Sequence, residues 1–344
     1  MRTLIVSDMH LGARLRRDVL RTPEVLEALL DALDGVDRLV LLGDVVELLE
    51  GRPRRAMEAA EPVLRAIGAR LGAGSEVILV PGNHDAALVR PWLRSHGETL
   101  DVDGRIPPDA TPMLAGIAAW LAPARVRVHY PGVWLSEGVY ATHGHYLDRH
   151  LLPESAYGIA RGLLGPSLRD GALPIDYEQP GRPSLTRVEA MLTRWLPRPL
   201  AALADDAAEY LRAATMPGIP LRLRNRRFAP LAATLLGLQM QRASIPALVR
   251  VVHRLGIDAD WVIFGHVHRG GPLPADDPRR WQGPGGRPRI ANTGAWTYEP
   301  LLIHRAAAPP HPYWPGGAIV LEDGAEPQAI GLLDHLGAEV LHGA

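Results

Sequence analysis

The chain has 344 residues, no cysteine, 47% apolar residues and a formal net charge of −1. This length suffices for one large domain or two, and the apolar share supports a sizeable buried core. Without cysteine, disulfide frameworks and thiolate metal sites are excluded, so any metal ion must be held by nitrogen and oxygen atoms. The near-neutral charge argues against broad electrostatic binding of nucleic acid.

No segment indicates export or membrane insertion. The first residues, Met1–Leu4, lead straight into a predicted core strand, so we expect no signal peptide. No stretch reaches the roughly 18 to 20 uninterrupted apolar residues of a membrane span. These features predict a cytoplasmic protein.

Short apolar runs bounded by glycine or proline predict five buried strands along the chain. They are Thr3–Ser7, Arg38–Leu42, Glu76–Val80, Val139–Thr142 and Trp261–Phe264. Between them, apolar residues at helical spacing predict helices over Pro23–Leu33 and Arg54–Leu71. The segment Arg125–Thr142 predicts two strands that turn at Pro131-Gly132. Residues 1–150 therefore have an α/β pattern.

From 151 to 250 the strand signals almost vanish, and segments separated by proline or glycine predict helices. These are Leu185–Leu196, Leu200–Ala214, Ala229–Gln241 and Ile245–Leu255. Strand character returns at Trp261, and later strands are predicted over Arg289–Thr293, Ala318–Glu322 and Gln328–Leu333. We therefore predict one α/β domain from 1–150 and 251–344, interrupted by a helical insertion at 151–250.

Each of the five buried strands is followed by side chains that can bind a metal ion. In chain order the motifs are Asp-x-His, Gly-Asp-x-x-Glu, Gly-Asn-His-Asp, His-Gly-His and Gly-His-x-His. Open α/β sheets place ligands at the carboxyl ends of their strands, so these side chains are expected to converge. The candidate metal ligands are Asp8, His10, Asp44, Asn83, His143, His266 and His268.

The spacing within these motifs suits coordination. Alternate residues on a strand share a face, so Asp8 and His10 can grip one ion. The same period would bring His266 and His268 together, although a turn could also do so. Asp44 has two carboxylate oxygens and can bridge two ions.

The ordered set of five motifs resembles the calcineurin-like metallophosphoesterase superfamily. The resemblance covers residues 1–150 and about 250 to 335, including the segment Asn292–Trp296. It implies a four-layer αββα sandwich, with the helical insertion as a cap, and a dinuclear metal centre. In the implied scheme one ion is bound by Asp8, His10, Asp44 and His268. The other is bound by Asp44, Asn83, His143 and His266.

Two metal ions roughly 3.5–4 Å apart suit phosphoryl chemistry, because they neutralise phosphate oxygens and activate a water for in-line attack. Carboxylate, amide and imidazole donors favour Mn²⁺, with Fe or Zn²⁺ as alternatives. His84 adjoins Asn83 and is the candidate catalytic residue, which would stabilise developing charge or protonate the leaving oxygen.

Two acidic residues beside the ligands have two interpretations each. Glu47 stands where the superfamily more commonly has aspartate, and it either orients the ligand loop or is simply exposed. Asp85 either supports the ligands from behind or caps a helix that starts at Ala86.

Several basic and polar residues are candidates for substrate binding. Arg14 and Arg269 flank metal motifs and could bind phosphate. His145 is a substrate-binding candidate that would lie near the site without binding metal. Asp148 and His150 could contact substrate, with ordinary surface or helix-start roles as the alternative. Four other histidines match no motif and are expected to be structural or solvated: His129, His253, His304 and His311.

Arg226 and Arg227 belong to an arginine cluster on the insertion, at 222–227. The cluster is either a solvated turn between helices or an anion clamp that faces the metals or an acidic membrane surface. A substrate clamp is the prediction carried forward, and peripheral membrane contact through the cap is a further expectation.

Within the superfamily, the residues in and around the metal motifs resemble those of the UDP-2,3-diacylglucosamine pyrophosphatase-like branch. The segments concerned are 7–12, 43–47 and 265–268, together with the insertion before the last of them. That branch closes a helical lid over a pyrophosphate with acyl chains. Here the insertion is longer, and His84 stands where that branch often has arginine.

We therefore expect a metal-dependent hydrolase of a phosphodiester, phosphomonoester or pyrophosphate bond, in a small nucleotide or lipid-linked substrate. One alternative is a DNA-repair-type nuclease, which would need a basic groove. Another is a non-catalytic metal-binding scaffold, which would be expected to lack ligands. No stable nucleic-acid partner is expected, and the oligomeric state is left open.

Overall fold

The computed structural model describes residues 1–13, 17–96, 100–150, 170–178, 243–299, 302–303 and 307–342. Three helices predicted on the insertion, over Leu185–Leu196, Leu200–Ala214 and Ala229–Gln241, lie outside these residues. The same is true of four residues named above: Arg14, Arg226, Arg227 and His304.

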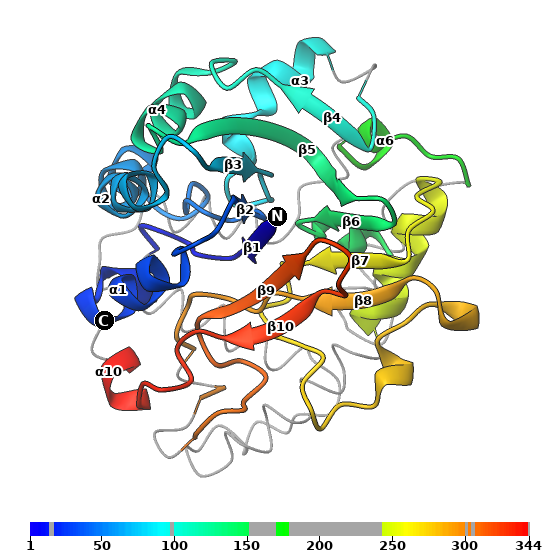
Figure 1. Cartoon of the computed structure of the whole chain (residues 1–344). Coiled ribbons are helices and arrows are strands. Elements are labelled where there is room, and N and C mark those ends of the chain that lie inside the picture. The colour runs from blue at the N-terminus through cyan, green and yellow to red at the C-terminus, as the bar shows by residue number, and fades with distance from the viewer. Residues whose placement is uncertain are drawn as a thin grey trace.

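The described strands form one continuous run of paired neighbours, in the order β10-β9-β1-β2-β3-β5-β6-β7-β8, with β4 beside β5 (Figure 1). Strands β1, β2, β3 and the start of β5 are parallel, as are β6, β7 and β8. The bounds are β1 Arg2–Val6, β2 Arg38–Leu41, β3 Glu76–Leu79, β4 Asp103–Ile106, β5 Arg125–Ser136, β6 Val139–Thr142, β7 Trp261–Phe264, β8 Arg289–Asn292, β9 Gly317–Glu322 and β10 Gln328–Gly331.

Strand β5 belongs to two sheets. Its first residues pair with β3, from Arg125 to Val128, and its later residues pair with β6, beginning at Gly132. Figure 1 shows it as a long curved arrow between these neighbours. We call the sheet that contains β1, β2 and β3 the first sheet, and the sheet that contains β6, β7 and β8 the second.

The predicted turn at Pro131-Gly132 is wrong, because β5 runs through both residues. The chain turns instead between β5 and β6, where Gly138 has a left-handed φ of 75°. Pro131 lies where β5 exchanges its β3 partner for β6, and a residue without an N–H is tolerated at such an interruption of the ladder.

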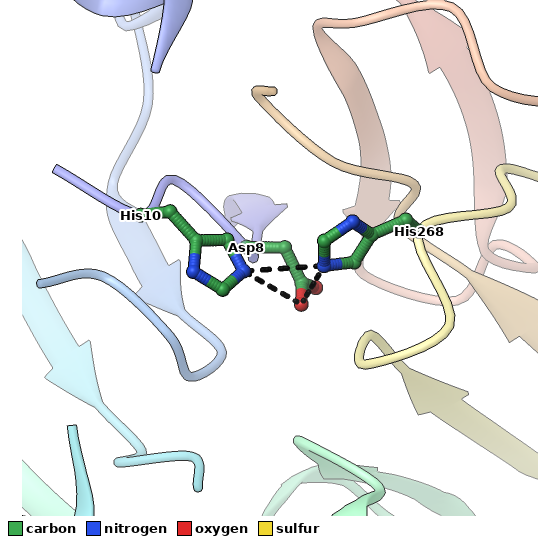
Figure 2. Close-up of side chains that lie close together, drawn as sticks. All are labelled: Asp8, His10 and His268. Atoms are coloured by element: carbon green, nitrogen blue, oxygen red, sulfur yellow. Dashed lines mark hydrogen bonds and ion pairs between the residues drawn. The ribbon is translucent and has the colours of Figure 1, made fainter. Parts of the chain in front are cut away.

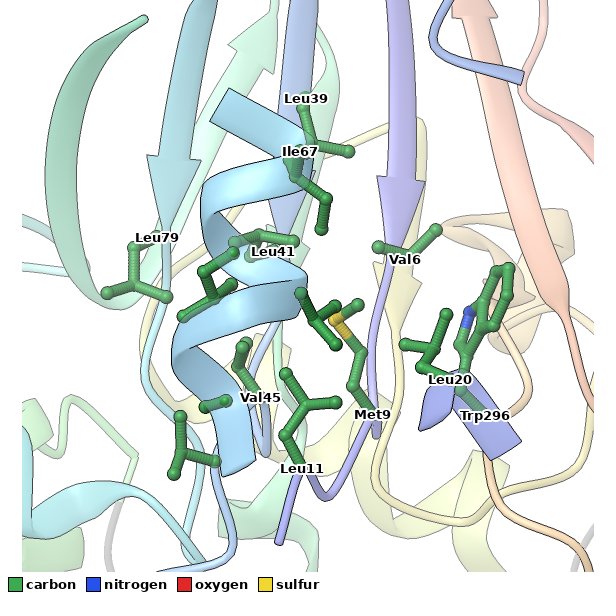
Figure 3. Packing of buried hydrophobic residues seen from close by; sticks show 14 of the residues in the cluster. Val6, Met9, Leu11, Leu20, Leu39, Leu41, Val45, Ile67, Leu79 and Trp296 are labelled. Atoms are coloured by element: carbon green, nitrogen blue, oxygen red, sulfur yellow. The ribbon is translucent and has the colours of Figure 1, made fainter. Parts of the chain in front are cut away.

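Alternating side chains on the strands divide the core into layers. On the first sheet, Leu39 and Leu41 face the helices and pack with Ile67 of α2, as Figure 3 shows. Their neighbour Val40 faces the other way and packs with Ile263 of the second sheet. Because side chains of a strand alternate between faces, this pattern covers both faces of the first sheet.

The far face of the second sheet carries its own helical layer. Val262 and Phe264 pack there with Leu248 and Val251 from the helical residues 243–254. The order of layers is therefore helix, sheet, sheet, helix, which confirms the predicted αββα sandwich. The helical stretch crosses the predicted domain boundary at 250, and the division into domain and insertion stays a prediction.

Three helices at the first sheet, α1, α2 and α4, begin at prolines, which suit the first turn because its N–H groups lack helical partners. The helices α1 and α2 confirm the two predicted segments to within one residue at each end. The helix bounds are α1 Pro23–Ala32, α2 Pro53–Leu71, α3 Arg90–His96, α4 Pro112–Trp120, α6 Pro174–Glu178 and α10 Ala338–His342. The short 3₁₀ helices are η2 Val19–Arg21, η3 Ala86–Leu88, η5 His145–Arg149, η8 Pro278–Arg280 and η9 Pro284–Gly286.

Membrane insertion can be examined from the helix lengths and their composition. Among the helices of the described residues, none combines the length and the apolar character needed to cross a bilayer.

Candidate metal centre

All seven predicted ligands lie in loops that follow the carboxyl ends of strands. The loops after β1, β2 and β3 of the first sheet carry the two aspartates, the asparagine and one histidine: Asp8, His10, Asp44 and Asn83. The loops after β6 and β7 of the second sheet carry His143, His266 and His268. The candidate site is thus assembled from both sheets.

Five of these ligands have a left-handed backbone that non-glycine residues rarely adopt. The φ angles are 53° at Asp8, 44° at His10, 52° at Asp44, 67° at His266 and 56° at His268. Each such conformation costs on the order of 1–3 kcal/mol and persists only where the surroundings enforce it. Their gathering at one place marks a functional site.

Backbone hydrogen bonds between neighbouring loops enforce this conformation. The N–H of Asp8 donates to the carbonyl of Gly43 at 3.0 Å, and the N–H of His10 donates to the carbonyl of Asp44 at 2.8 Å. Trp296 N–H donates to the carbonyl of Asp8 at 3.0 Å. The loops after β1 and β2 therefore hold each other in register.

Three glycines allow the ligand loops to pack closely. A methyl group on Gly43 would collide with the imidazole of His143, and one on Gly82 would collide with the Asp44 carboxylate. One on Gly265 would collide with Asp8. A side chain at any of these positions would displace a candidate ligand.

The first group of candidate ligands is Asp8, His10 and His268, shown in Figure 2. His268 Nε2 lies 3.2 Å from Oδ1 of Asp8 and 3.1 Å from Nε2 of His10. His10 Nδ1 contacts Oε2 of Glu47 at 2.9 Å, so Nδ1 carries the proton of a neutral ring and Nε2 has a lone pair.

The donor atoms of this first group fit a metal ion. Oδ2 of Asp8 accepts hydrogen bonds from His266 N–H, at 3.0 Å, and from the Ser7 hydroxyl. Oδ1 of Asp8 is buried and has no hydrogen-bond partner within the described residues. A cation between this oxygen and the two imidazole nitrogens would satisfy all three atoms.

The second group is Asp44, His143 and His266, with Asn83 beside it. The Nδ1–H of His143 donates to the carbonyl of Leu42 at 3.0 Å. In a neutral ring its Nε2 is then an acceptor, and it faces Oδ2 of Asp44 and Oδ1 of Asn83, each at 3.1 Å. Three acceptors that converge in this way also fit a cation.

The pKa of His143 reflects the same crowding of acceptors. Burial lowers the pKa of His143, but the Asp44 carboxylate outweighs burial and raises it to about 9. The Asp44 charge that a bound cation would neutralise is therefore the charge that raises the pKa of this imidazole.

Asp44 belongs to the second group and also to a third group, in which it lies with His10 and His84. Its Oδ1 accepts a hydrogen bond from the backbone N–H of His84 at 2.8 Å. Burial raises the pKa of Asp44, but the charges of His143 and His84 outweigh it and hold the pKa well below its usual range. The position between the groups is the one that a bridging ligand requires.

Glu47 ties a candidate ligand to the candidate proton donor. Its Oε2 lies 2.9 Å from Nδ1 of His10 and 2.7 Å from Nδ1 of His84. Its Oε1 accepts from the backbone N–H groups of Leu49 and Glu50, at 3.0 and 2.9 Å. The alternative of simple exposure is wrong, because Glu47 is 1% exposed.

Charges also set the pKa of the two partners in this contact. Burial lowers the pKa of His84, but Asp44 and Glu47 outweigh it and raise it to about 10. Burial raises the pKa of Glu47, but His84 and His10 outweigh it and hold it below the ordinary value. The two carboxylates therefore favour the protonated form of His84.

Asp85 supports the site from behind. It is the N-cap residue of η3, and its carbonyl accepts from the N–H of Leu88 at 2.9 Å, but its side chain makes no cap hydrogen bond. Its carboxylate accepts from the N–H of Gly82 at 2.6 Å and from that of Val45 at 2.8 Å. Burial and the charge of Asp44 raise the pKa of Asp85 to about 6.

The structure places three of the predicted substrate residues close to the ligands or their loops. Asp148 Oδ1 contacts His266 Nε2 at 3.0 Å, so His266 would use Nδ1 toward a metal. The ring of His145 lies beside that of His143, with centroids 5.6 Å apart. Arg269 pairs with both oxygens of Asp276, at 3.0 and 2.7 Å, and is 6% exposed. Substrate binding by these residues stays a prediction.

Sequence reasoning missed polar residues that support the site. Ser7 bonds to Asp8 and contacts the Thr293 hydroxyl at 2.5 Å, which links β1 to the loop after β8. The adjacency of Ser7 to Asp8 was a signal for the first contact. Glu178 reaches the neighbourhood of His145 from α6, and no spacing in the sequence indicates that approach.

Comparison with known proteins places this geometry in context. Residues 1–164 match the sequence profile of the calcineurin-like phosphoesterase family. No curated protein matches the chain significantly.

Solved structures resemble the chain only distantly. A dimetal phosphatase from Danio rerio is 13% identical, with 96% of this chain and 99% of that chain covered and a TM-score of 0.37. A cold-active protein-tyrosine phosphatase from a psychrophilic Shewanella species is 12% identical, with 95% and 80% covered and a TM-score of 0.28. Over residues 1–164, which carry the first four of the five metal motifs, the chain thus matches the calcineurin-like phosphoesterase family.

Proposed function

We propose that the chain is a metal-dependent phosphoesterase that hydrolyses a phosphodiester, phosphomonoester or pyrophosphate bond. The observation that carries this proposal is the convergence of carboxylate, amide and imidazole acceptors on two groups, one of Asp8, His10 and His268 and the other of Asp44, His143 and His266 with Asn83, which are linked because Asp44 also lies with His10. The family match over residues 1–164 supports the same class of reaction. Asp8, His10, Asp44 and His268 would hold one divalent ion. Asp44, Asn83, His143 and His266 would hold the other.

Two bound divalent ions would neutralise phosphate oxygens and lower the pKa of a water for in-line attack. The protein's own contribution is orientation and proton transfer. His84 donates through Nδ1 to Glu47, so its Nε2 is the nitrogen left for the substrate. A protonated Nε2 would protonate the leaving oxygen. Glu47 fixes the rings of His10 and His84 together, and so sets the proton donor relative to the metal ligands.

The donor set limits the choice of metal. Nitrogen and oxygen ligands with several imidazoles suit Mn²⁺, Fe or Zn²⁺ better than Mg²⁺, which prefers oxygen and water. Manganese is the identity we propose.

For the substrate we propose a nucleotide or lipid-linked phosphate, on the resemblance to UDP-2,3-diacylglucosamine pyrophosphatases. A substrate panel tests this directly: 4-nitrophenyl phosphate, bis(4-nitrophenyl) phosphate, nucleoside diphosphate sugars, acylated sugar nucleotides and single-stranded DNA. Turnover confined to DNA would contradict the small-substrate proposal.

The reaction class is tested by metal removal and restoration. The protein is dialysed exhaustively against a chelator, its metal content is measured by mass spectrometry, and hydrolysis of bis(4-nitrophenyl) phosphate is followed with Mn²⁺, Fe²⁺, Zn²⁺ or Mg²⁺ added singly. We expect no turnover without metal and the fullest recovery with Mn²⁺. Full turnover by the metal-free protein would contradict the proposal.

A further inference from the structure

The short helix α6 meets the catalytic domain beside the candidate metal centre. Glu178, its last residue, accepts a hydrogen bond at Oε1 from the hydroxyl of Tyr146 at 2.8 Å and another from the hydroxyl of Tyr130. Tyr177 stacks on Tyr146, with ring centroids 4.6 Å apart and planes 8° from parallel. Both phenols that bind Glu178 are buried. The carboxylate of Glu178, from the segment between the fourth and fifth motifs, is thus hydrogen-bonded to buried side chains of the α/β domain.

His145 lies at the inner end of this network. Its Nε2 is 3.2 Å from the hydroxyl oxygen of Tyr130 and 3.9 Å from Oε1 of Glu178. Its ring lies beside that of His143, a candidate metal ligand. Its Nδ1 is buried and has no hydrogen-bond partner among the described residues. One nitrogen is therefore held by the network, and the other is buried without a hydrogen-bond partner in the described part of the chain.

The direction of the hydrogen bonds sets the tautomer of His145. A carboxylate has no proton, so the single hydroxyl hydrogen of Tyr130 goes to Glu178. The oxygen of Tyr130 can then only accept, and Nε2 of His145 must be the donor. In a neutral ring Nδ1 is left with a lone pair. The order Glu178, Tyr130, His145 therefore turns Nδ1 into an acceptor.

We propose that Glu178 and Tyr130 are positioning residues that present Nδ1 of His145 as a hydrogen-bond acceptor to a hydroxyl on the alcohol portion of the substrate. The inference rests on the proposed phosphoesterase function. The metal ligands and the phosphate oxygens that they would attract are acceptors too, so an additional acceptor beside them requires a donor. Sugar and glycerol esters carry hydroxyl donors next to the phosphate, whereas simple alkyl and aryl esters carry none. The substrate class is therefore a phosphoester of a polyol.

The tautomer is tested without metal or turnover. Histidine-labelled protein is measured by ¹⁵N NMR, and His145→Gln identifies the resonances of the ring. We expect Nε2 protonated and Nδ1 unprotonated in the wild type. Glu178→Gln keeps an oxygen that accepts from Tyr130, so the tautomer should stay. Glu178→Leu frees the Tyr130 hydroxyl to donate to Nε2, which should move the proton to Nδ1. A protonated Nδ1 in the wild type overturns the proposal.

The substrate class is tested with two esters that share one leaving group. Glyceryl 4-nitrophenyl phosphate carries hydroxyls, and propyl 4-nitrophenyl phosphate does not. For the metal-loaded wild type and Glu178→Gln we expect kcat/KM to favour the glyceryl ester about tenfold, the effect of one ordinary hydrogen bond. For Glu178→Leu the ratio should fall to near one. Tyr130→Phe, a second variant that removes the acceptor of Nε2–H, should give the same result.

Tyr140→Phe is the matched control, because it removes another buried phenol, which donates to the carbonyl of Val102 at 2.7 Å and not to Glu178 or His145. It should keep the wild-type ratio. If the network only fastens α6, the Glu178 and Tyr130 variants will lower the Tm and leave the ratio unchanged, which overturns the proposal. A wild-type ratio near one overturns it as well. Failure to hydrolyse either ester, with the phosphomonoesters and pyrophosphates of the substrate panel inert as well, would refute the phosphoesterase function, while the NMR result would still decide the role of Glu178.

Discussion

The two ends of the parallel strands of the first sheet carry buried carboxylates that differ in their ion-pair partners. At the amino-terminal end, Glu76 forms ion pairs with Arg38 at 3.3 Å, with Arg125 at 3.5 Å, and with Arg127. At the carboxyl-terminal end, Asp8 and Asp44 have imidazoles as their only ion-pair partners in the described part of the chain.

The difference shows which end is built for stability and which for binding. Burial raises the pKa of Glu76, but the surrounding arginines, Arg127 foremost, outweigh it and lower the pKa. That carboxylate already has its counterions. The carboxylates of the site face ring nitrogens that can supply lone pairs instead, so under the proposed function a cation from solution would complete the group. The predictions below test this contrast, from the largest expected effect on activity to the smallest.

Asp44→Asn should abolish activity almost completely. The substitution removes a negative charge that two groups of ligands share. We expect a loss of about 10⁴-fold or more, at or beyond the upper end for removal of a proton-transfer group. Metal analysis should show less than the wild-type content. Wild-type metal content together with wild-type kcat would contradict the bridging role.

His84→Ala should lower the rate while both metals remain bound. The expected loss is about 10²–10⁴-fold for an alkyl ester, the range for a general acid. It should be much smaller for a nitrophenyl ester, whose leaving group needs no proton. Equal losses for both esters would argue against proton donation. Loss of metal would instead assign His84 to the group that it forms with His10 and Asp44.

Glu47→Gln should weaken the hydrogen bonds that hold His10 and His84 in place. The amide has one oxygen, which cannot accept both from the two histidines and from the backbone N–H groups of Leu49 and Glu50. We expect a loss of about 10–100-fold in metal affinity or activity, the range for residues that orient metal ligands. Glu50→Gln is the control and should have a smaller effect, because in the described part of the chain the Glu50 carboxylate forms no hydrogen bond or ion pair with His10 or His84. Metal titration and kcat together measure the effect.

Gly82→Ala and Gly74→Ala compare the two ends of β3 directly. A methyl at Gly82 collides with Asp44 and His143, whereas one at Gly74 has nothing within 4 Å. We expect Gly82→Ala to reduce metal affinity by about tenfold, which is the low end of the range for changes that disturb the orientation of metal ligands. Gly74→Ala should leave it unchanged. Equal metal affinity in the two variants would show that the close packing is irrelevant.

Glu76→Gln should lower stability and leave activity unchanged. It leaves the three arginines without their shared carboxylate, which we expect to cost about 1–3 kcal/mol. Because the folded-state pKa is lowered, the carboxylate's stabilisation is present above its ordinary pKa of 4.5 and is lost as the pH falls through the lowered value. Urea denaturation at pH 7 and at decreasing pH measures both effects. Reduced metal content in this variant would break the contrast between the two ends.

The sequence was sufficient where a local pattern determines the structure. The apolar runs before Asp8, Asp44 and His143 predicted strands β1, β2 and β6, because a buried strand needs continuous apolar residues. The motifs after these strands then converge, because parallel strands end at one edge of a sheet. The αββα order rested on the family resemblance, and the structure confirms it.

Other features depend on contacts between distant segments. The two-sheet role of β5 follows from an exchange of strand partners, and the local Pro131-Gly132 signal suggested a turn instead. Asp85 lies one residue before η3, yet its carboxylate is taken by Gly82 and Val45. The approach of Glu178 to Tyr130 joins residues 48 positions apart and has no periodic signature.

The passage of β5 from one sheet to the other has a consequence for the order of folding. Asp8, Asp44 and Asn83 arrive with the first sheet, whereas His143, His266 and His268 arrive with the second, and β5 is the strand that connects them. Neither half alone contains the full set of donors, and the pairing of β5 with β3 joins residues 49 positions apart, such as Glu76 and Arg125. High-affinity metal uptake during refolding should therefore lag behind secondary-structure formation and report the moment at which the two sheets come together.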